Sequence, residues 1–186
     1  KTDFKNDEIL MSAFSPGGTS QYPDKDDIDA SFATSLVSNA GLGKLDEIQL
    51  QKRLTGKIVS VAPYISANYE GFNGNASPAD LELLFQLIHL YFTEPRKDTN
   101  AYKSFIEKQK GFIKNVAANP QFYFIIESNK IKTQNHKRER LIPTEEELNK
   151  LNFDRAYEIF KDRFSDAGDF TFTFVGNFDE NQICLM

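Results

Sequence analysis

The chain has 186 residues, of which 40% are hydrophobic and 26% are charged, and its formal net charge is −5 at pH 7. This is the composition of one globular domain with a sizeable core, so it excludes an intrinsically disordered chain. Lys and Arg are scattered among the acidic residues, which gives no sustained positive field and argues against nucleic acid or an anionic membrane as a partner.

The cysteine content and the chain ends limit which covalent modifications and which kind of chain are expected. The single cysteine, Cys184, rules out an internal disulfide framework, and its position third from the end does not form a prenylation motif. No segment approaches the roughly 18 uninterrupted apolar residues of a membrane span. Because the sequence starts with neither Met nor a charged-then-apolar leader, we expect a mature or an excised segment, and we predict a fragment of a longer multidomain chain.

The N-terminal part predicts a buried strand followed by a turn. Ile9 to Phe14 is a short apolar run, and the SPGG sequence of Ser15 to Gly18 is typical of a turn. The glycine pair lacks the G-x-x-x-x-G-K-S/T spacing of a phosphate loop, so a plain turn is favoured. The acidic run Asp24 to Asp29 lacks the glycine and the distal glutamate of a calcium loop, and its carboxylates instead favour the start of a helix.

The segment Asp26 to Gly43 predicts a helix of about four turns that ends at a glycine. Its apolar stripe consists of Ile28, Phe32, Leu36 and Ala40. Small hydroxyl side chains occupy another stripe, which consists of Ser31, Thr34, Ser35 and Ser38. Such side chains either let a neighbouring backbone approach closely or line a cavity, and neither use supplies a metal ligand or a general base. Whether the hydroxyl stripe contacts a substrate or only packs stays open.

The middle of the chain predicts a short helix followed by two paired strands. The helix runs from Asp46 to Leu54, and the strands run from Lys57 to Ser66 and from Asn68 to Ala76. Pro63 lacks a backbone N–H, which favours a sheet edge or a bulge for the first of these strands. An edge strand is able to add an extended peptide, although most edges have no such role.

A strongly apolar helix follows the two strands. Ser77 caps it, Pro78 occupies its first position, and it runs to Glu94 with apolar side chains on most of its surface. His89 lies inside this run without a second His or Cys nearby. Because a metal site needs several converging ligands, we expect a core or boundary histidine.

The C-terminal part predicts further helices and a closing strand. Helix start signals occur at Asp98 or Thr99, Asn119 with Pro120, Thr144 with Glu147, and Asn152. The basic cluster HKRER at His136 to Arg140 is short and contains a Glu, so we expect an exposed loop and not a nucleic-acid patch. Phe170 to Val175 alternates strictly and predicts a strand that ends at Gly176.

The order of these elements predicts an α+β fold. We expect residues 1–186 to form one domain in which the helices pack on one face of a largely antiparallel sheet. The first and last strands must meet in that sheet for the domain to close.

Five segments follow one another in a characteristic order: AFSPGGTS, ASFATSLVSNAGLG, LQKRLTGKIVSVAPYISANYEGFNGNASPADLELLFQLIHLYFTEPR, PTEEELNKLNFDRAYEIFKDRF and FTFTFVGNFD. In this order they resemble one domain of the pitrilysin/insulinase family of zinc peptidases, and the likeness is strongest to its bacterial, periplasmic PqqL-like branch. The resemblance covers nearly the whole chain. It implies the metallopeptidase-domain fold shared with LuxS and the mitochondrial processing peptidase.

In the catalytic domain of that family, an inverted motif H-x-x-E-H lies on the helix equivalent to Asp26–Gly43, and a later helix supplies a third zinc ligand. Two histidines at i and i+4 hold Zn²⁺ while the glutamate takes a proton from the metal-bound water. On the later helix, Asn115 stands near the ligand position and Glu107 is the available carboxylate. None of the residues equivalent to the motif can replace it; they are Thr34, Ser35, Leu36, Val37 and Ser38.

The resemblance therefore implies a noncatalytic domain from the C-terminal half of a two-part zinc metalloendopeptidase. We expect no catalytic, cofactor-binding or metal-binding residue in this chain and no activity of the chain alone, with zinc held in the catalytic domain of the parent protein. By the same likeness, this half closes with the catalytic half of the same polypeptide around an unfolded peptide, so the domain forms part of a chamber wall. An alternative from another class is a structural or partner-binding protein that reuses the fold without catalysis.

Overall fold

The computed structural model describes residues 7–179 and 183, so Cys184 lies outside the described residues. Its sheet has four strands in the order β2-β3-β1-β4, and every neighbouring pair is antiparallel. The strands are β1 (Ile9–Pro16), β2 (Val59–Ile65), β3 (Tyr69–Ala76) and β4 (Thr171–Gly176). Strand β1 pairs with β4, which confirms that the first and last strands meet in the sheet.

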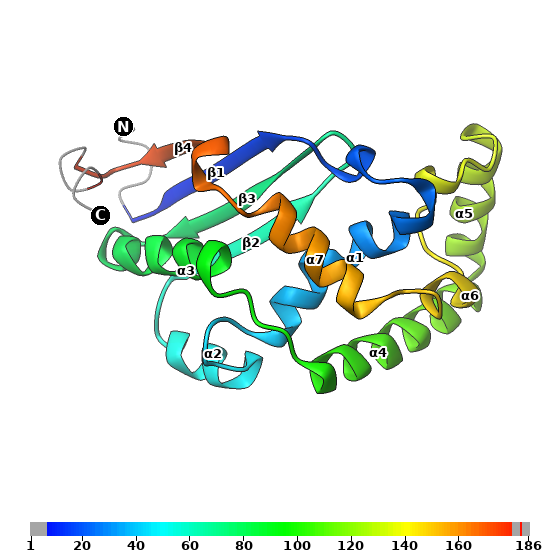
Figure 1. Cartoon of the computed structure of the whole chain (residues 1–186), viewed down its shortest axis with the longest axis horizontal. Coiled ribbons are helices and arrows are strands. Elements are labelled where there is room, and N and C mark those ends of the chain that lie inside the picture. The colour runs from blue at the N-terminus through cyan, green and yellow to red at the C-terminus, as the bar shows by residue number, and fades with distance from the viewer. Residues whose placement is uncertain (1–6, 180–182, 184–186) are drawn as a thin grey trace.

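Within the described residues, seven α-helices accompany the sheet: α1 (Asp27–Ala40), α2 (Glu47–Leu54), α3 (Leu81–Thr93), α4 (Thr99–Ala117), α5 (Pro120–Lys132), α6 (Glu145–Leu148) and α7 (Phe153–Arg163). Figure 1 shows α1, α3 and α7 gathered on one side of the sheet, while α4 and α5 extend to the end of the molecule far from the termini. The expected α+β fold is confirmed. None of these helices in the described part of the chain is long and apolar enough to cross a membrane.

The helix starts follow the signals in the sequence. Asp46 and Thr144 each accept a hydrogen bond from the backbone N–H three residues later and form capping boxes at α2 and α6. The side chains of Asn119 and Asn152 cap α5 and α7. These local interactions explain why the starts of the helices could be predicted without knowledge of the tertiary structure.

The strands show the period of two that separates a covered face from an uncovered one. In β1 the odd-numbered residues are buried and the even-numbered residues are exposed. Ser15 and Pro16 still belong to β1, so the turn expected from SPGG begins only at Gly17. Pro63 lies on the edge strand β2, as expected from its missing N–H.

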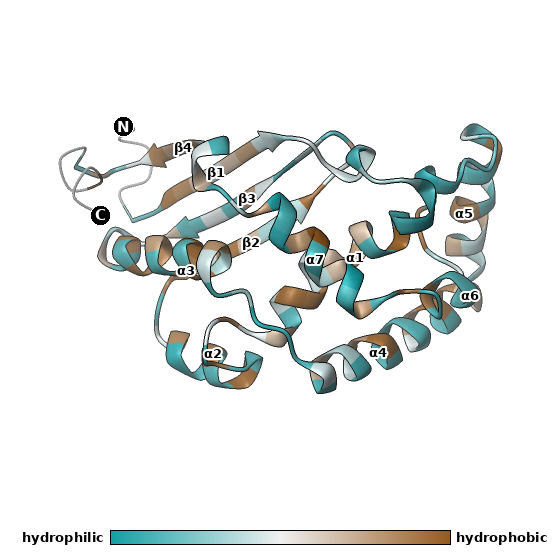
Figure 2. Cartoon of the chain, viewed as in Figure 1, coloured by the Kyte–Doolittle hydropathy of each residue, from teal (hydrophilic) through white to brown (hydrophobic). Residues whose placement is uncertain are grey.

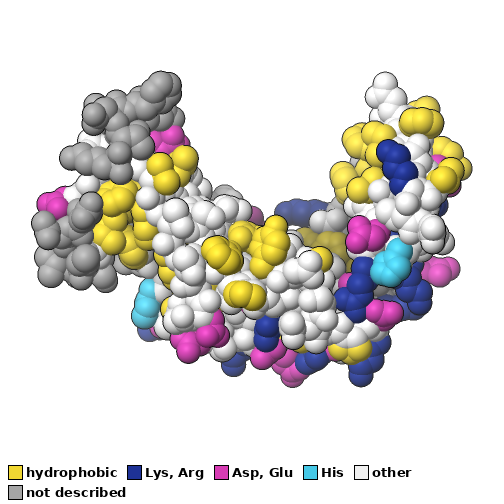
Figure 3. Space-filling model, turned by 90° about the horizontal axis from the view of Figure 1, so that it is seen from above, with side chains coloured by type: hydrophobic (Ala, Val, Ile, Leu, Met, Phe, Trp, Pro, Cys, Tyr) yellow, Lys and Arg dark blue, Asp and Glu magenta, His cyan; other side chains and the backbone are white. Residues whose placement is uncertain are grey.

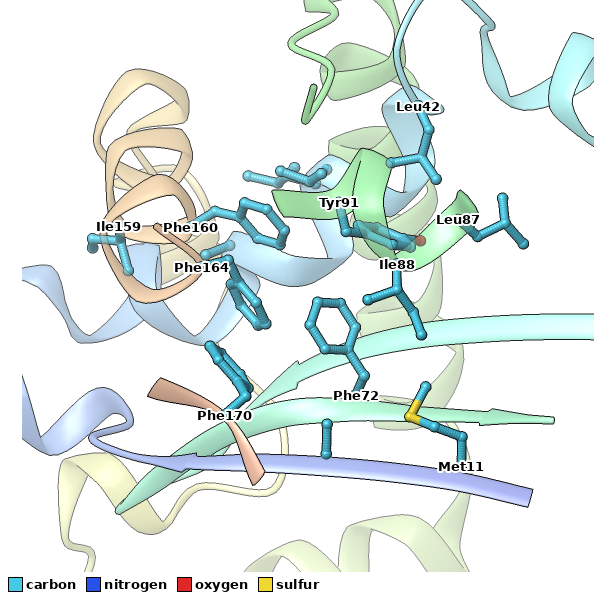
Figure 4. Close-up of a cluster of buried hydrophobic side chains, with 14 of the residues drawn as sticks. Met11, Leu42, Phe72, Leu87, Ile88, Tyr91, Ile159, Phe160, Phe164 and Phe170 are labelled. Atoms are coloured by element: carbon cyan, nitrogen blue, oxygen red, sulfur yellow. The ribbon is translucent and has the colours of Figure 1, made fainter. Parts of the chain in front are cut away.

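The core lies between the sheet and the helices, and a group of phenylalanine rings lies within it. Phe72 of β3 is fully buried, and its ring centroid lies 4.9 Å from that of Phe164 and 5.3 Å from that of Phe92. Figure 4 shows Phe72 pointing from the sheet towards side chains of α3 and α7, with Phe170 beside it. Tilted and edge-to-face ring pairs of this kind add to the stabilisation from burying the rings.

Candidate functional surface

Helix α1 is the helix on which the resemblance locates the zinc motif of a catalytic domain. Its fully buried side chains include the small residues Ala30 and Ala33, whereas Ile28 and Phe32 are only half-buried. The apolar stripe expected from the sequence is therefore only partly right. Helix α1 packs against β2, α4 and α7 at once, and small side chains let these elements approach closely.

The hydroxyl groups of α1 do not form one surface. Thr34 is buried, whereas Ser31 is exposed and donates a hydrogen bond of 2.8 Å to the carbonyl oxygen of Asp27. The hydroxyl of Ser38 lies 3.5 Å from that of Tyr91 on α3. These three positions face different surroundings, which favours packing over a shared contact with a substrate.

The described residues of this chain do not form a cluster of side chains that fits a zinc ion. In the described ranges no group of three or more His, Cys, Asp or Glu side chains converges as a metal site would require. Glu107 is exposed on α4 and pairs with Lys110 at 3.4 Å, and Asn115 is also exposed. The expectation that this domain holds no metal stays a prediction.

His89 departs from its expected environment. It lies on the exposed side of α3, opposite the buried residues Leu84, Ile88 and Tyr91. The expectation of a core or boundary histidine is therefore wrong, because the apolar surface of α3 does not extend around the whole helix.

The acidic side chains at the start of α1 form hydrogen bonds with groups from the distant C-terminal part of the chain. Asp26 accepts hydrogen bonds from Arg155 at 2.8 and 3.0 Å, and Asp29 accepts one of 2.7 Å from the backbone N–H of Asn152. Asp24 binds Arg138 at 2.7 Å, and this contact holds the pKa of the Asp24 carboxyl below its usual value. The carboxylates therefore join distant segments of the fold.

Arg138 shows that the HKRER cluster is not simply an exposed loop. Its guanidinium is half-buried and also donates to the carbonyl oxygens of Thr19 and Tyr22, at 3.0 and 2.7 Å. The neighbouring Lys137 and Glu139 are exposed, as expected. One arginine of the cluster thus holds the loop against the turn that follows β1.

A buried carboxylate that sequence reasoning missed lies at the other end of that turn. Glu70 of β3 is only 2% exposed; it accepts a hydrogen bond of 2.5 Å from the N–H of Gly18 and lies 3.7 Å from Arg163 of α7. Burial raises the pKa of Glu70, an effect that the Gly18 N–H and Arg163 partly offset. Glu70 shares the side of β3 that carries Phe72, so strict alternation could have identified it as inward-facing.

Tyr22 completes this network. Its hydroxyl donates to Asp162, and its ring lies under the guanidinium groups of Arg155 and Arg163. Burial and the contact with Asp162 raise the pKa of Tyr22 to about 12. The network has no nucleophile paired with a general base. We interpret it as the anchor that fixes the Gly17–Gly18 turn to α7.

The uncovered side of the sheet, which we call the outer sheet face, is the most distinctive surface. It consists of residues 10, 12, 14 and 16 of β1, 60, 62 and 64 of β2, 69, 71, 73 and 75 of β3, and 171, 173 and 175 of β4. No one of these 14 positions carries a charged side chain. Instead, Ser, Thr and Asn side chains alternate with exposed apolar ones such as Leu10, Phe14 and Val175.

Two interactions order this face. The hydroxyl of Ser60 donates to the side-chain oxygen of Asn75 across β2 and β3, at 2.5 Å. The hydroxyl of Tyr64 donates to the carbonyl oxygen of Ala13 at 3.2 Å, which places it over Gly71. A side chain at Gly71 would collide with that carbonyl oxygen, so the glycine keeps this part of the face flat.

The chain is similar in sequence to part of two much longer zinc proteases. It is 24% identical over 187 residues to the probable zinc protease PqqL of Haemophilus influenzae, covering 98% of this chain and 19% of that protein. It is 26% identical over 185 residues to a PQQL-like zinc protease of Arabidopsis thaliana, covering 96% of this chain and 16% of that protein. The chain thus spans less than a fifth of the length of these curated relatives. No protein-family model matches it.

Solved structures share its fold. The periplasmic protease PqqL of Escherichia coli matches with a TM-score of 0.76 and 21% identity, over 100% of this chain and 20% of that one. The ferredoxin protease FusC, solved in complex with Arabidopsis ferredoxin, matches with a TM-score of 0.70 and 17% identity, over 95% of this chain and 19% of that one. The comparisons support the expected C-terminal-half domain of a PqqL-like peptidase.

Proposed function

We propose that this PqqL-like peptidase domain is noncatalytic and that its outer sheet face lines part of a chamber in which an unfolded peptide is enclosed. The zinc and the residues that activate water lie, in this proposal, in a catalytic half of the same polypeptide. The small fraction of each relative's length that the chain covers is consistent with such a partner half. Because the Escherichia coli neighbour is described as a periplasmic protease, we propose the same compartment.

The observation that carries the proposal is the absence of charge from the outer sheet face. In a chain that is 26% charged, a surface of 14 positions would ordinarily carry several charges. Charged residues are depleted where a surface is enclosed by a partner, since burying an unpaired charge is costly. A sheet face that is left uncovered by its own helices and also lacks charge is therefore suited to enclosure.

The composition of the face suits a peptide of varied sequence. Hydroxyl and amide side chains, such as Ser12, Asn73 and Thr173, can hydrogen-bond to peptide groups of any residue. Exposed rings and aliphatic groups, such as Phe14 and Val175, add apolar contact without a requirement for charge. The face can hold an unfolded chain without selecting a particular sequence.

Charge introduced into the face tests this function. In the full-length polypeptide, Phe14→Asp should weaken the turnover of acidic quenched-fluorescent peptides by about tenfold, because a like charge repels them. The matched control is Ile48→Asp on α2, which is also exposed (64%, against 49% for Phe14) but lies off the face and should leave turnover unchanged. Equal effects of the two variants on peptide turnover would contradict the proposal. If Phe14→Asp disrupted the association of this domain with the rest of the polypeptide but left turnover unaltered, a structural role would be favoured.

Metal analysis tests the noncatalytic part separately. The purified chain should contain no zinc above background and should not cleave the same peptides, because no side chains in the described part of the chain converge to hold the ion. Stoichiometric zinc in the isolated chain would overturn the assignment of Thr34–Ser38 as the segment that replaces the zinc motif.

A further inference from the structure

Helix α5 carries an apolar segment, residues 122–126, that this chain leaves largely uncovered. None of its described residues is buried, and Phe122, Tyr123 and Phe124 are 48%, 58% and 71% exposed. Figure 2 shows hydrophobic residues along α5, and Figure 3 shows apolar side chains gathered on the arm at that end of the molecule. The three rings alone leave on the order of 350 Å² in water, as large as the largest apolar patch on many monomers.

The apolar side chains surround the first half of α5. Residues 122–126 are consecutive and all apolar, and a helical turn takes 3.6 residues, so they occupy every side of the helix. Ile131, two turns further on, is 80% exposed. A helix that is apolar all round is normally enclosed by other elements. A flat partner would cover one side of α5, whereas a groove would cover several.

The surroundings of α5 are basic although the chain is acidic. Residues 99–142, which we call the α4–α5 arm, carry nine Lys and Arg against three Glu, whereas the other residues carry 13 against 24. Within the described ranges, Lys114 and Lys132 have no acidic partner. Figure 3 shows Lys and Arg side chains beside the apolar ones at this end. A complementary surface would carry carboxylates around an apolar centre.

A cavity lies at the base of the arm and could accept a side chain of a partner. A cavity of about 640 Å³ lies between α4, α5 and the segment 140–147. Its apolar wall includes Ile113 of α4, Ile126 of α5 and Leu141. The arm therefore offers both a projecting helix and an adjacent cavity, which is the form of an interdigitated interface.

We propose that α5 inserts into an apolar groove with an acidic rim on an adjoining domain of the same polypeptide, and that this domain places an apolar side chain in the cavity at the base of the arm. The proposal rests on the proposed function only in requiring a longer polypeptide. It assigns the arm to assembly of the chamber, whereas the outer sheet face is assigned to the peptide.

Two other occupants fit the surface less well. A helix that lies in a membrane surface needs one polar face, and α5 has apolar residues on every side. A second copy of this chain would offer α5 its outer sheet face, which is flat and covers only one side of the helix. Both occupants are outcomes that the experiment distinguishes.

Hydrogen exchange of α5 tests the proposal directly. The backbone amides of residues 121–132, which follow Pro120 in α5, should exchange at least tenfold more slowly in the full-length polypeptide than in the isolated chain, because the groove encloses the helix. Phe124→Glu should remove most of this protection in the full-length polypeptide. Since α5 contributes no buried residue to the domain, the same variant should leave the thermal unfolding of the isolated chain unchanged.

Matched variants control for nonspecific effects. Ile48→Glu on α2 introduces the same charge at a residue of similar exposure and should leave the protection of α5 intact. Lys132→Glu on the arm should reduce the protection about tenfold, whereas Lys52→Glu on α2 should not alter it.

Three results would overturn the proposal. They are equal exchange of α5 in the two forms, concentration-dependent association of the isolated chain that Phe124→Glu abolishes, and binding of the chain to phosphatidylglycerol vesicles through α5. The proposed function fails independently, because it predicts altered peptide turnover for Phe14→Asp whatever the exchange rate of α5.

Discussion

The two faces of the sheet are built from alternate residues of the same four strands, yet they differ in almost every respect. The inner face carries mostly apolar side chains that pack against the helices, with Phe72 fully buried among aromatic rings. The outer sheet face carries small polar and scattered apolar side chains and no charge. The inner face accounts for the stability of the domain, and the outer face is free to serve a function.

Substitutions on the two faces should therefore affect different properties of the domain. Stability should respond to the inner face, and interaction with a peptide should respond to the outer one.

Phe72→Ala should have the largest effect. It removes a fully buried ring from the centre of the core and should lower the free energy of unfolding by about 3–5 kcal/mol, as measured by urea denaturation. Phe14→Ala removes the same side chain from the outer face, where it is 49% exposed, and should cost less than about 1 kcal/mol. Similar losses for the two variants would show that the outer face is also part of the core.

Gly71→Ala should have the next largest effect and is an exception on the outer face. An added Cβ would lie 1.9 Å from the carbonyl oxygen of Ala13, so the backbone must shift at a cost of about 1–3 kcal/mol. Gly111→Ala is the control, since nothing lies within 4 Å of a Cβ there and the residue is inside α4. That variant should stabilise the domain by about 0.5–1 kcal/mol. A neutral result for Gly71→Ala would indicate that β3 has room on this face.

Glu70 should give a smaller effect that depends on pH. Because burial raises the pKa of Glu70 in the folded state, its contribution to stability is present below the pKa of an unfolded glutamate, about 4.3, and is lost as the pH rises through the folded value. Glu70→Gln keeps an acceptor for the Gly18 N–H and removes the titration. The stability of the wild-type chain relative to this variant should therefore fall with rising pH in that window, as followed by urea denaturation. A relative stability that rises with pH would contradict the assignment.

Local signals in the sequence were sufficient for most of the fold. Caps at Asp46, Thr144 and Asn152 act through hydrogen bonds within three residues, so their effect does not depend on the rest of the molecule. The alternation of β1 and the position of Pro63 likewise follow from the backbone itself.

The features that were missed depend on residues far away in the sequence. Arg138 reaches Asp24 and Glu70 reaches Gly18 only because the chain folds back on itself. The side of α1 that is buried is decided by packing against three other elements. The absence of charge from the outer sheet face becomes visible only when four separate strands are placed side by side.

Photo-crosslinking at the outer sheet face tests the central claim most directly. Benzoylphenylalanine is placed at position 14 or, as a control, at position 48 of the full-length polypeptide, and an unstructured peptide is added. The account predicts a crosslink to the peptide from position 14 and none from position 48. Absence of a crosslink at position 14, or equal crosslinking at both positions, would contradict the claim that this face encloses a peptide.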